Sequence, residues 1–291
     1  MILAPLRGVT VRRFRRTFAD AIREAGFTEV VTPFITANAG VDPLKDRELR
    51  RDWECGAEPF AVTPQFIGKD PAAFGECLRR VKAAGYGTAD LNCGCPFPMV
   101  RNKGRGSGLL RTPDVLARML EAGCEAMGPG ALSVKARLGV DRSDELLRLM
   151  PILNGFPLRF LAVHARTARQ MYEGDCDIGA FLEVARAAKM PVVYNGDLDI
   201  PPSPPRAPAG AAPFGAMVGR GFVRSLASRA DIGTLLDRYV ADSLAELGSE
   251  RPVLGRMKEL LAYWKDLPKW NLRWKVAKMA RSLSELRCWD A

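Results

Sequence analysis

The chain of 291 residues is long enough for one large α/β barrel with a small appended domain. Its formal net charge of +10 favours an anionic partner, and nucleic acid fits this charge better than a membrane surface does. Seven cysteines without regular spacing argue against a secreted disulfide framework. Residues 1–5 lack the features of a signal peptide, and no window approaches about 18 uninterrupted apolar residues. We therefore expect a cytoplasmic protein without a membrane span.

Short apolar segments alternate with helical patterns over residues 1–228. Strand character is found at 2–6, 27–35, 60–67, 88–92, 132–137, 160–164, 192–195 and 216–218. Helical spacing is found at 11–25, 71–84, 113–127, 143–153 and 178–188. Eight strands that alternate with helices predict a parallel sheet closed into a (β/α)₈ TIM barrel.

Two segments depart from this alternation. Residues 38–58 carry mixed charge without a clear period, which predicts a loop with room for one short helix. Residues 200–213 contain six prolines at the place of the seventh helix. Because proline removes a backbone donor and clashes within a helix, we expect this helix to be absent or very short. An extended segment would replace it.

From residue 229 the chain has helical patterns without strands, at 232–247, 253–265 and 272–286. Four of the five tryptophans lie in this part, and residues 251–291 hold ten Lys or Arg against four Asp or Glu. We therefore divide the chain into a barrel domain at 1–228 and a small, basic, all-α domain at 229–291.

The segment Asp90-Leu91-Asn92-Cys93-Gly94-Cys95-Pro96 contains the strongest motif. The strand at 88–92 must stop at Gly94 and Pro96, so Cys95 lies where it gives way to a basic, glycine-rich loop at 97–108. A thiol there is expected to be accessible and close to positive charge, which favours reactivity. The alternative is a small residue that fills a tight turn.

Polar residues recur at the ends of the predicted strands, where the active sites of such barrels lie. They are Arg7, Gln65, Asn92, Lys135, Arg137, His164, Arg166, Asn195, Asp197 and Arg220. His164 is the only histidine. Lys135 lies within a predicted apolar strand, where a lysine is unfavourable unless it is paired with an anion. The alternative is that its side chain extends from the strand end to solvent.

The motif at residues 92–96, with its glycine-rich loop and Leu109-Leu110, resembles the Asn-x-Gly-Cys-Pro active-site motif of the tRNA-dihydrouridine synthases. The polar residues match this family in order and approximate spacing along the barrel. The resemblance implies an FMN-dependent (β/α)₈ barrel with a C-terminal helical domain. Such an enzyme reduces specific uridines of tRNA to 5,6-dihydrouridine with NADPH.

The resemblance also implies roles for individual residues. Cys95 would be the catalytic acid that protonates C5 of the uracil after hydride transfer from FMN to C6, and its ordinary pKa of about 8.5 suits this role. Asn92 and Arg166 would hold the uracil. The expected FMN-binding residues are Pro5, Leu6, Arg7, Gln65, Lys135, His164, Asn195, Gly196, Asp197, Gly219 and Arg220. The target uridine would be flipped out of its stack, and the helical domain would grip the tRNA phosphates.

Some features depart from the family pattern. Cys93 stands where the family has an apolar residue, Leu6-Arg7 replaces Met followed by Ala or Glu, and the helical domain is shorter than usual. Two alternatives therefore stay open: an FMN barrel that reduces a small molecule, as dihydroorotate or dihydropyrimidine dehydrogenases do, and a flavin-free tRNA-binding barrel. We expect a monomer and no metal site, because Cys93 and Cys95 have no nearby Cys or His to complete one.

Overall fold

The computed structural model describes residues 1–42, 58–206, 209 and 214–286. Ten parallel strand segments form one sheet in the order β3-β5-β6-β7-β8-β9-β10-β1-β2-β4. They are β1 (Ile2–Leu3), β2 (Glu29–Val31), β3 (Ile35–Thr36), β4 (Ala61–Thr63), β5 (Gln65–Ile67), β6 (Ala89–Cys93), β7 (Leu132–Gly139), β8 (Leu161–Thr167), β9 (Val192–Asn195) and β10 (Phe214–Val218).

The ten segments correspond to eight barrel strands, because two predicted strands are each interrupted once. β2 and β3 are halves of one strand, and β4 and β5 flank Pro64, which has no N–H for the ladder. Beside this break, the Gln65 N–H donates to the Thr32 hydroxyl at 3.1 Å. β2 pairs with β4 and β3 with β5, while β1 pairs with both β10 and β2. The ring therefore closes, and the predicted TIM barrel is confirmed.

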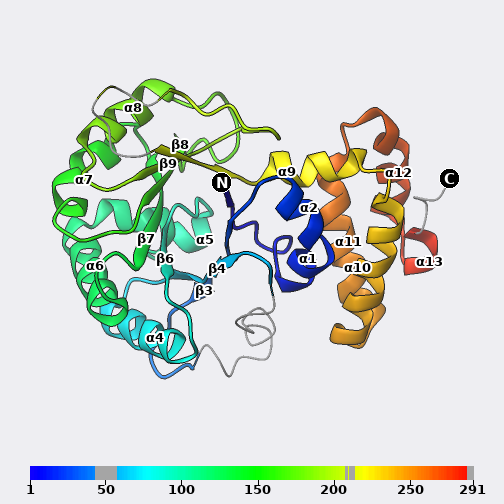
Figure 1. The fold of residues 1–291 in the computed structure, drawn as a ribbon, viewed down its shortest axis with the longest axis horizontal. Coiled ribbons are helices and arrows are strands. Elements are labelled where there is room, and N and C mark those ends of the chain that lie inside the picture. The colour runs from blue at the N-terminus through cyan, green and yellow to red at the C-terminus, as the bar shows by residue number, and fades with distance from the viewer. Residues whose placement is uncertain (43–57, 207–208, 210–213, 287–291) are drawn as a thin grey trace.

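Helices cover the outside of this ring (Figure 1). Those that follow strands are α4 (Pro71–Ala83), α6 (Pro113–Met127), α7 (Glu145–Leu153) and α8 (Ile178–Ala187). Asp70 starts α4, where its carboxylate accepts the N–H of Ala72 at 3.0 Å. The predicted helix 11–25 is divided into α1 (Arg12–Thr17) and α2 (Ala19–Glu24).

The proline-rich segment contains no helix among its described residues, 200–206 and 209, as predicted. Its remaining residues lie outside the described part, as do residues 43–57 of the predicted loop 38–58. After β10 the chain forms the short helix α9 (Arg220–Ser225), which leads into the C-terminal helices.

The C-terminal part consists of α10 (Ile232–Leu247), α11 (Glu250–Leu261), α12 (Pro268–Met279) and α13 (Leu283–Leu286). Of these helices, α10 and α11 lie beside α1 and α2 in Figure 1, and α12 and α13 lie farther from them. The indole N–H of Trp264 donates to the Val223 carbonyl at 2.7 Å, and that of Trp270 to the Ala227 carbonyl at 3.1 Å. Both tryptophans are buried and therefore attach these helices to the barrel. The domain boundary at 228 stays a prediction.

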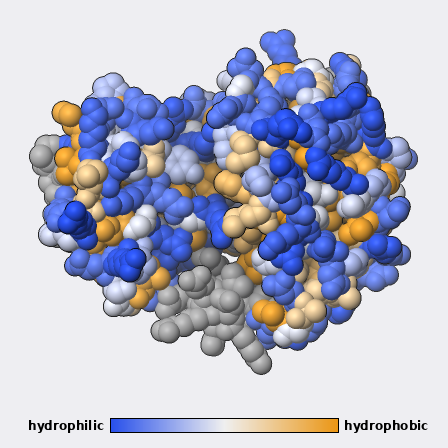
Figure 2. Space-filling model, turned by 180° about the vertical axis from the view of Figure 1, so that it is seen from behind, coloured by the Kyte–Doolittle hydropathy of each residue, from blue (hydrophilic) through white to orange (hydrophobic). Residues whose placement is uncertain are grey.

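The surface seen from behind is largely hydrophilic, with apolar residues in small groups (Figure 2). Within the described residues, no helix has the length and apolar character needed to cross a bilayer.

Candidate active site

Cys95 lies at the end of β6 in a turn that Asn92 holds together. The Asn92 side-chain oxygen accepts the N–H of Gly94 at 3.1 Å and the N–H of Cys95 at 2.9 Å. The glycine-rich loop then folds back, and Ser107 donates to the Cys95 carbonyl through its N–H and its hydroxyl, at 3.2 and 2.9 Å. Only 7% of Cys95 is exposed. The expectation of an openly accessible thiol is therefore wrong, because the loop returns against the Cys95 backbone and leaves only a small part of the residue exposed.

The electrostatic surroundings keep the Cys95 thiol protonated. Burial raises the pKa of Cys95 above its ordinary value and outweighs the lowering effects of the Phe97 N–H and of the cations Arg7 and Arg137. Positive charge near the thiol was predicted, but these two cations come from other strand ends and not from the loop 97–108. Cys93 is fully buried, and burial together with Asp90 raises its pKa strongly. Cys93 is thus an unreactive core residue.

A chain of hydrogen bonds beneath Cys95 connects three neighbouring strands. Asn92 donates to the Gln65 side-chain oxygen at 2.8 Å, and Gln65 donates to Asp90 at 2.8 Å. The Ser133 hydroxyl also donates to Asp90, at 2.7 Å. Burial raises the pKa of Asp90 to about 6. Sequence reasoning assigned no role to Asp90 or Ser133, although a carboxylate within an apolar strand was a signal that could have found the first.

Lys135 and Arg137 project from β7 toward the same end of the barrel. Lys135 Nζ donates to the Asn195 side-chain oxygen at 2.9 Å, so its partner is an amide and not an anion. Burial and Arg137 lower the pKa of Lys135 to about 8. Arg137 is 2% exposed and donates to the carbonyls of Gly94 at 3.0 Å and Thr167 at 2.7 Å. Arg137 therefore fastens the Cys95 turn to β8.

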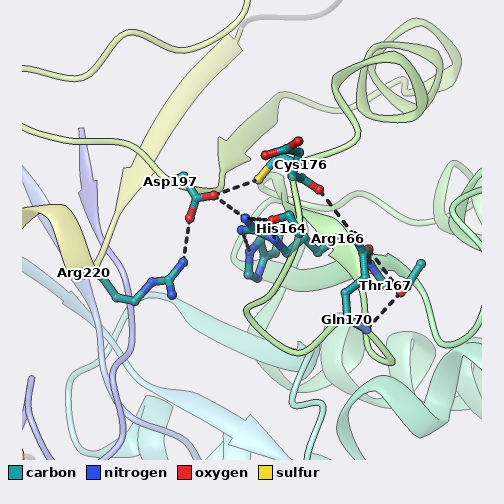
Figure 3. Close-up of polar contacts among 9 residues, drawn as sticks. His164, Arg166, Thr167, Gln170, Cys176, Asp197 and Arg220 are labelled. Carbon is teal, nitrogen blue, oxygen red and sulfur yellow. Dashed lines mark hydrogen bonds and ion pairs between the residues drawn. The ribbon is translucent and has the colours of Figure 1, made fainter. Parts of the chain in front are cut away.

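His164, Arg166, Asp197 and Arg220 form a connected cluster at the ends of three strands (Figure 3). Asp197 accepts from Arg166 and, at 2.6 Å, from Arg220. His164 Nε2 lies 3.3 Å from Arg166 Nη1. Burial and the surrounding cations, Arg137 foremost, lower the pKa of His164 well below its ordinary value. The imidazole is therefore neutral at physiological pH.

The first and last strands of the barrel meet beside this cluster. A Cβ on Gly219 would lie 3.2 Å from Ala4 Cβ and 3.4 Å from Leu6 Cδ2, so the glycine allows the two strand ends to approach. Pro5 and Leu6 are half-buried, and exposed Arg7 lies over the Phe34 ring at 5.6 Å. Gly196 has a φ of +146°, and a Cβ there would lie 2.6 Å from Cys176 Sγ. All the predicted site residues are thus found at one end of the barrel.

Tyr172, which sequence reasoning missed, lies in the loop after β8. Its ring centroid is 5.3 Å from the guanidinium of Arg137 and 5.0 Å from that of Arg220. An aromatic residue in a loop that follows a site strand was the available signal. Among the described residues, no group of three or more potential metal ligands is present.

The family model described as Dihydrouridine synthase (Dus) matches residues 2–225, which include every strand of the barrel. The chain belongs to the dihydrouridine synthase family. It is 33% identical over 202 residues to tRNA-dihydrouridine synthase B of Pseudomonas aeruginosa, covering 69% of this chain and 59% of that protein. It is 32% identical over 225 residues to a probable tRNA-dihydrouridine synthase of Rhodobacter capsulatus, covering 76% and 67%.

This dihydrouridine synthase family member spans about three fifths of the length of several curated relatives that it matches. Among solved structures, morphinone reductase is similar with a TM-score of 0.52 and 12% identity, covering 77% of this chain and 82% of that chain. At that identity the similarity supports the barrel fold alone.

Proposed function

We propose that this protein is a tRNA-dihydrouridine synthase, which uses FMN and NADPH to reduce the 5,6 double bond of specific uridines in tRNA. Family membership and the names of the relatives support the reaction class. The observation that carries the proposal is Cys95, a protonated thiol fixed at the end of β6 beside Arg7 and Arg137. A thiol so placed is suited to donate one proton and then to be stabilised as a thiolate.

The donor set around the strand ends fits FMN, which combines an anionic phosphate with an electron-rich ring. Arg220, which lies at the end of β10, can bind the phosphate, with Gly219, Gly196 and Asp197 around it and Asn195 toward the ribityl chain. When bound and reduced by NADPH, FMN would supply a hydride to C6 of the uracil.

The flavin ring would be held between residues of opposite sides of the barrel. Pro5, Leu6 and Arg7 would lie behind it, and His164 would contact it as a neutral imidazole. Lys135 would offer positive charge, and its pKa, lowered to about 8 by burial, leaves it protonated in most molecules at neutral pH. The Gln65 amide has one hydrogen left beyond the one that Asp90 accepts, and this hydrogen would bind the ring edge.

Cys95 would donate its proton to C5 of the uracil. Arg7 and Arg137 favour the resulting thiolate until it takes a proton from water. Asn92 and Arg166 would orient the uracil edge. The Asn92 oxygen is already occupied by two backbone N–H groups, so its contribution would be its second amide hydrogen.

The tRNA would be held by the positive charge of the chain, and exposed cations gather on and around α12. They are Lys265, Lys269, Lys275, Lys278 and Arg281. We further propose that the protein acts as a monomer in the cytoplasm, as expected for an enzyme that modifies tRNA.

The test begins with the absorption spectrum of the purified full chain and anaerobic addition of NADPH. Flavin bands that bleach and then return on addition of an unmodified tRNA transcript, with dihydrouridine in the product, would support the proposal. Return with free pyrimidines alone would favour a small-molecule reductase. A protein that stays colourless after FMN is supplied, yet binds tRNA, would favour the flavin-free alternative. Cys95→Ala, which keeps the site but removes the acid, is the matched control.

A further inference from the structure

Two exposed apolar side chains directly follow the buried thiol of the candidate active site. Phe97 is 43% exposed and Met99, on α5 (Pro98–Arg101), is 73% exposed. Phe97 is adjacent to the site itself, because its N–H is directed at the Cys95 sulfur. Its carbonyl accepts the N–H groups of Val100 and Arg101, both at 2.9 Å, so the backbone beneath the two side chains is ordered.

Large exposed apolar side chains are uncommon in the described part of the chain. Besides these two, they are Val41, Tyr172, Leu272, Val276 and Met279. The Tyr172 ring is already engaged by Arg137 and Arg220. Phe97 and Met99 are therefore the exposed apolar side chains close to Cys95 in the chain for which no described residue provides burial or a ring contact.

The surroundings of this pair are basic. Residues 97–111 contain three arginines and one lysine without any Asp or Glu. Arg101, Lys103 and Arg105 form no ion pair with any residue that the structure describes, whereas Arg111 is paired with Asp141. Cations without an acidic partner among the described residues, next to an aromatic side chain, are suited to bind a nucleic acid backbone and to stack on its bases.

We propose that Phe97 and Met99 form a wedge that enters the tRNA stack at the place vacated by the target uridine. This inference rests on the proposed function. A base that reacts at the bottom of a barrel mouth must leave its stack, and unstacking is unfavourable unless another group fills the gap. Apolar side chains inserted between bases fill such gaps in other nucleic acid complexes. Phe97 is in the right place, because the flipped base must reach Cys95 two residues away.

The test compares the FMN-loaded wild type with a Phe97→Ala/Met99→Ala double variant. Single-turnover reoxidation of the NADPH-reduced enzyme is followed with a saturating unmodified tRNA transcript and with a short oligouridylate, in which little stacking must be broken. We expect the variant to lose about tenfold or more of the rate with tRNA, and much less with the oligouridylate. Phe97→Trp should restore the rate with tRNA. Val41→Ala removes another exposed apolar side chain, at a position outside both the wedge and the α12 surface, and should leave the saturating rate unchanged.

A second readout follows unstacking itself. The transcript carries 2-aminopurine beside the uridine that the wild type reduces. Its 2-aminopurine fluorescence should increase on binding to the wild type, and should increase less on binding to the double variant. Equal rate losses with both RNAs would overturn the wedge and place the pair in the uracil pocket. Weakened FMN binding would instead make it a cover for the cofactor, and an unchanged rate would remove any role. A wild type that no tRNA reoxidises would refute the proposed function instead.

Discussion

Asp90 provides the sharpest test of the buried network beneath Cys95. Its carboxylate is fully buried and accepts from Gln65 and Ser133. Asp90→Asn keeps the shape and removes the charge. The new side-chain oxygen can still accept from Gln65, and its amide can donate to Ser133, whose hydroxyl can turn toward the Ala89 carbonyl at 3.3 Å. We therefore expect the variant to fold and to keep the Gln65 and Asn92 side chains in place.

The expected magnitude follows from the pKa of Asp90, which burial raises from 3.8 to about 6. The folded protein binds this proton more tightly than the unfolded chain, so the free energy of unfolding decreases as pH rises between these two values. The decrease amounts to about 3 kcal/mol and is complete above the folded pKa. Asp90→Asn lacks it. The stability of the variant relative to wild type should therefore increase by about 2 kcal/mol between pH 4 and pH 7, because part of the total change lies below pH 4.

The assay is urea unfolding of both proteins across this pH range, where Lys135 stays protonated. Taking the difference removes the pH dependence that the two proteins share. Ser133→Ala removes a hydrogen bond that lowers the pKa of Asp90, so it should enlarge the step and move its midpoint to higher pH. A difference in the free energy of unfolding that does not change with pH would refute the reasoning. A step of opposite sign would show that attraction to Lys135 outweighs burial.

Three further predictions concern the site. Cys95→Ala should slow reoxidation of the reduced enzyme by tRNA about 100-fold or more while flavin reduction by NADPH is unchanged, and equal losses in both steps would contradict the assigned role. Gly106→Ala and Gly104→Ala should each lower stability by about 1 kcal/mol, because both glycines have positive φ, but only at Gly106 would a Cβ press on Cys95 Cβ, at 2.9 Å. Rapid-mixing kinetics should accordingly show slower proton transfer for Gly106→Ala alone, and a similar effect of Gly104→Ala would point to general loop distortion. The proton NMR signal of His164, the only histidine, should show no titration midpoint near the ordinary 6.5, because burial and cations hold its pKa well below that value. A midpoint near 6.5 would show an exposed imidazole.

Local sequence patterns were sufficient for most of the elements and for the place of the motif, although the predicted helix 272–286 is divided into α12 and α13. The predicted helices 113–127 and 232–247 coincide with α6 and α10, because apolar periodicity and terminal Pro or Gly act within one element. Strand 192–195 coincides with β9 for the same reason. Since the polar residues follow strand ends, and parallel strands in a barrel end on one side, their convergence was predictable without coordinates.

Contacts between distant segments were decided only by the tertiary structure. Cys95 is buried because Ser107 and Gly106 return over it, and no pattern around residue 95 encodes that closure. Trp264 and Trp270 are buried against carbonyls of residues 223 and 227, which are about forty positions away in the chain.

Charge pairing shows the same division most clearly. The sequence by itself placed Lys135, His164, Arg166, Asp197 and Arg220 on, or directly after, strands of the barrel. Which of them meet, and which pKa values change as a result, depended on strand register and on how much water each side chain loses. Periodicity is a property of neighbours along the chain, whereas burial and electrostatic energy depend on groups that only folding brings within a few ångströms.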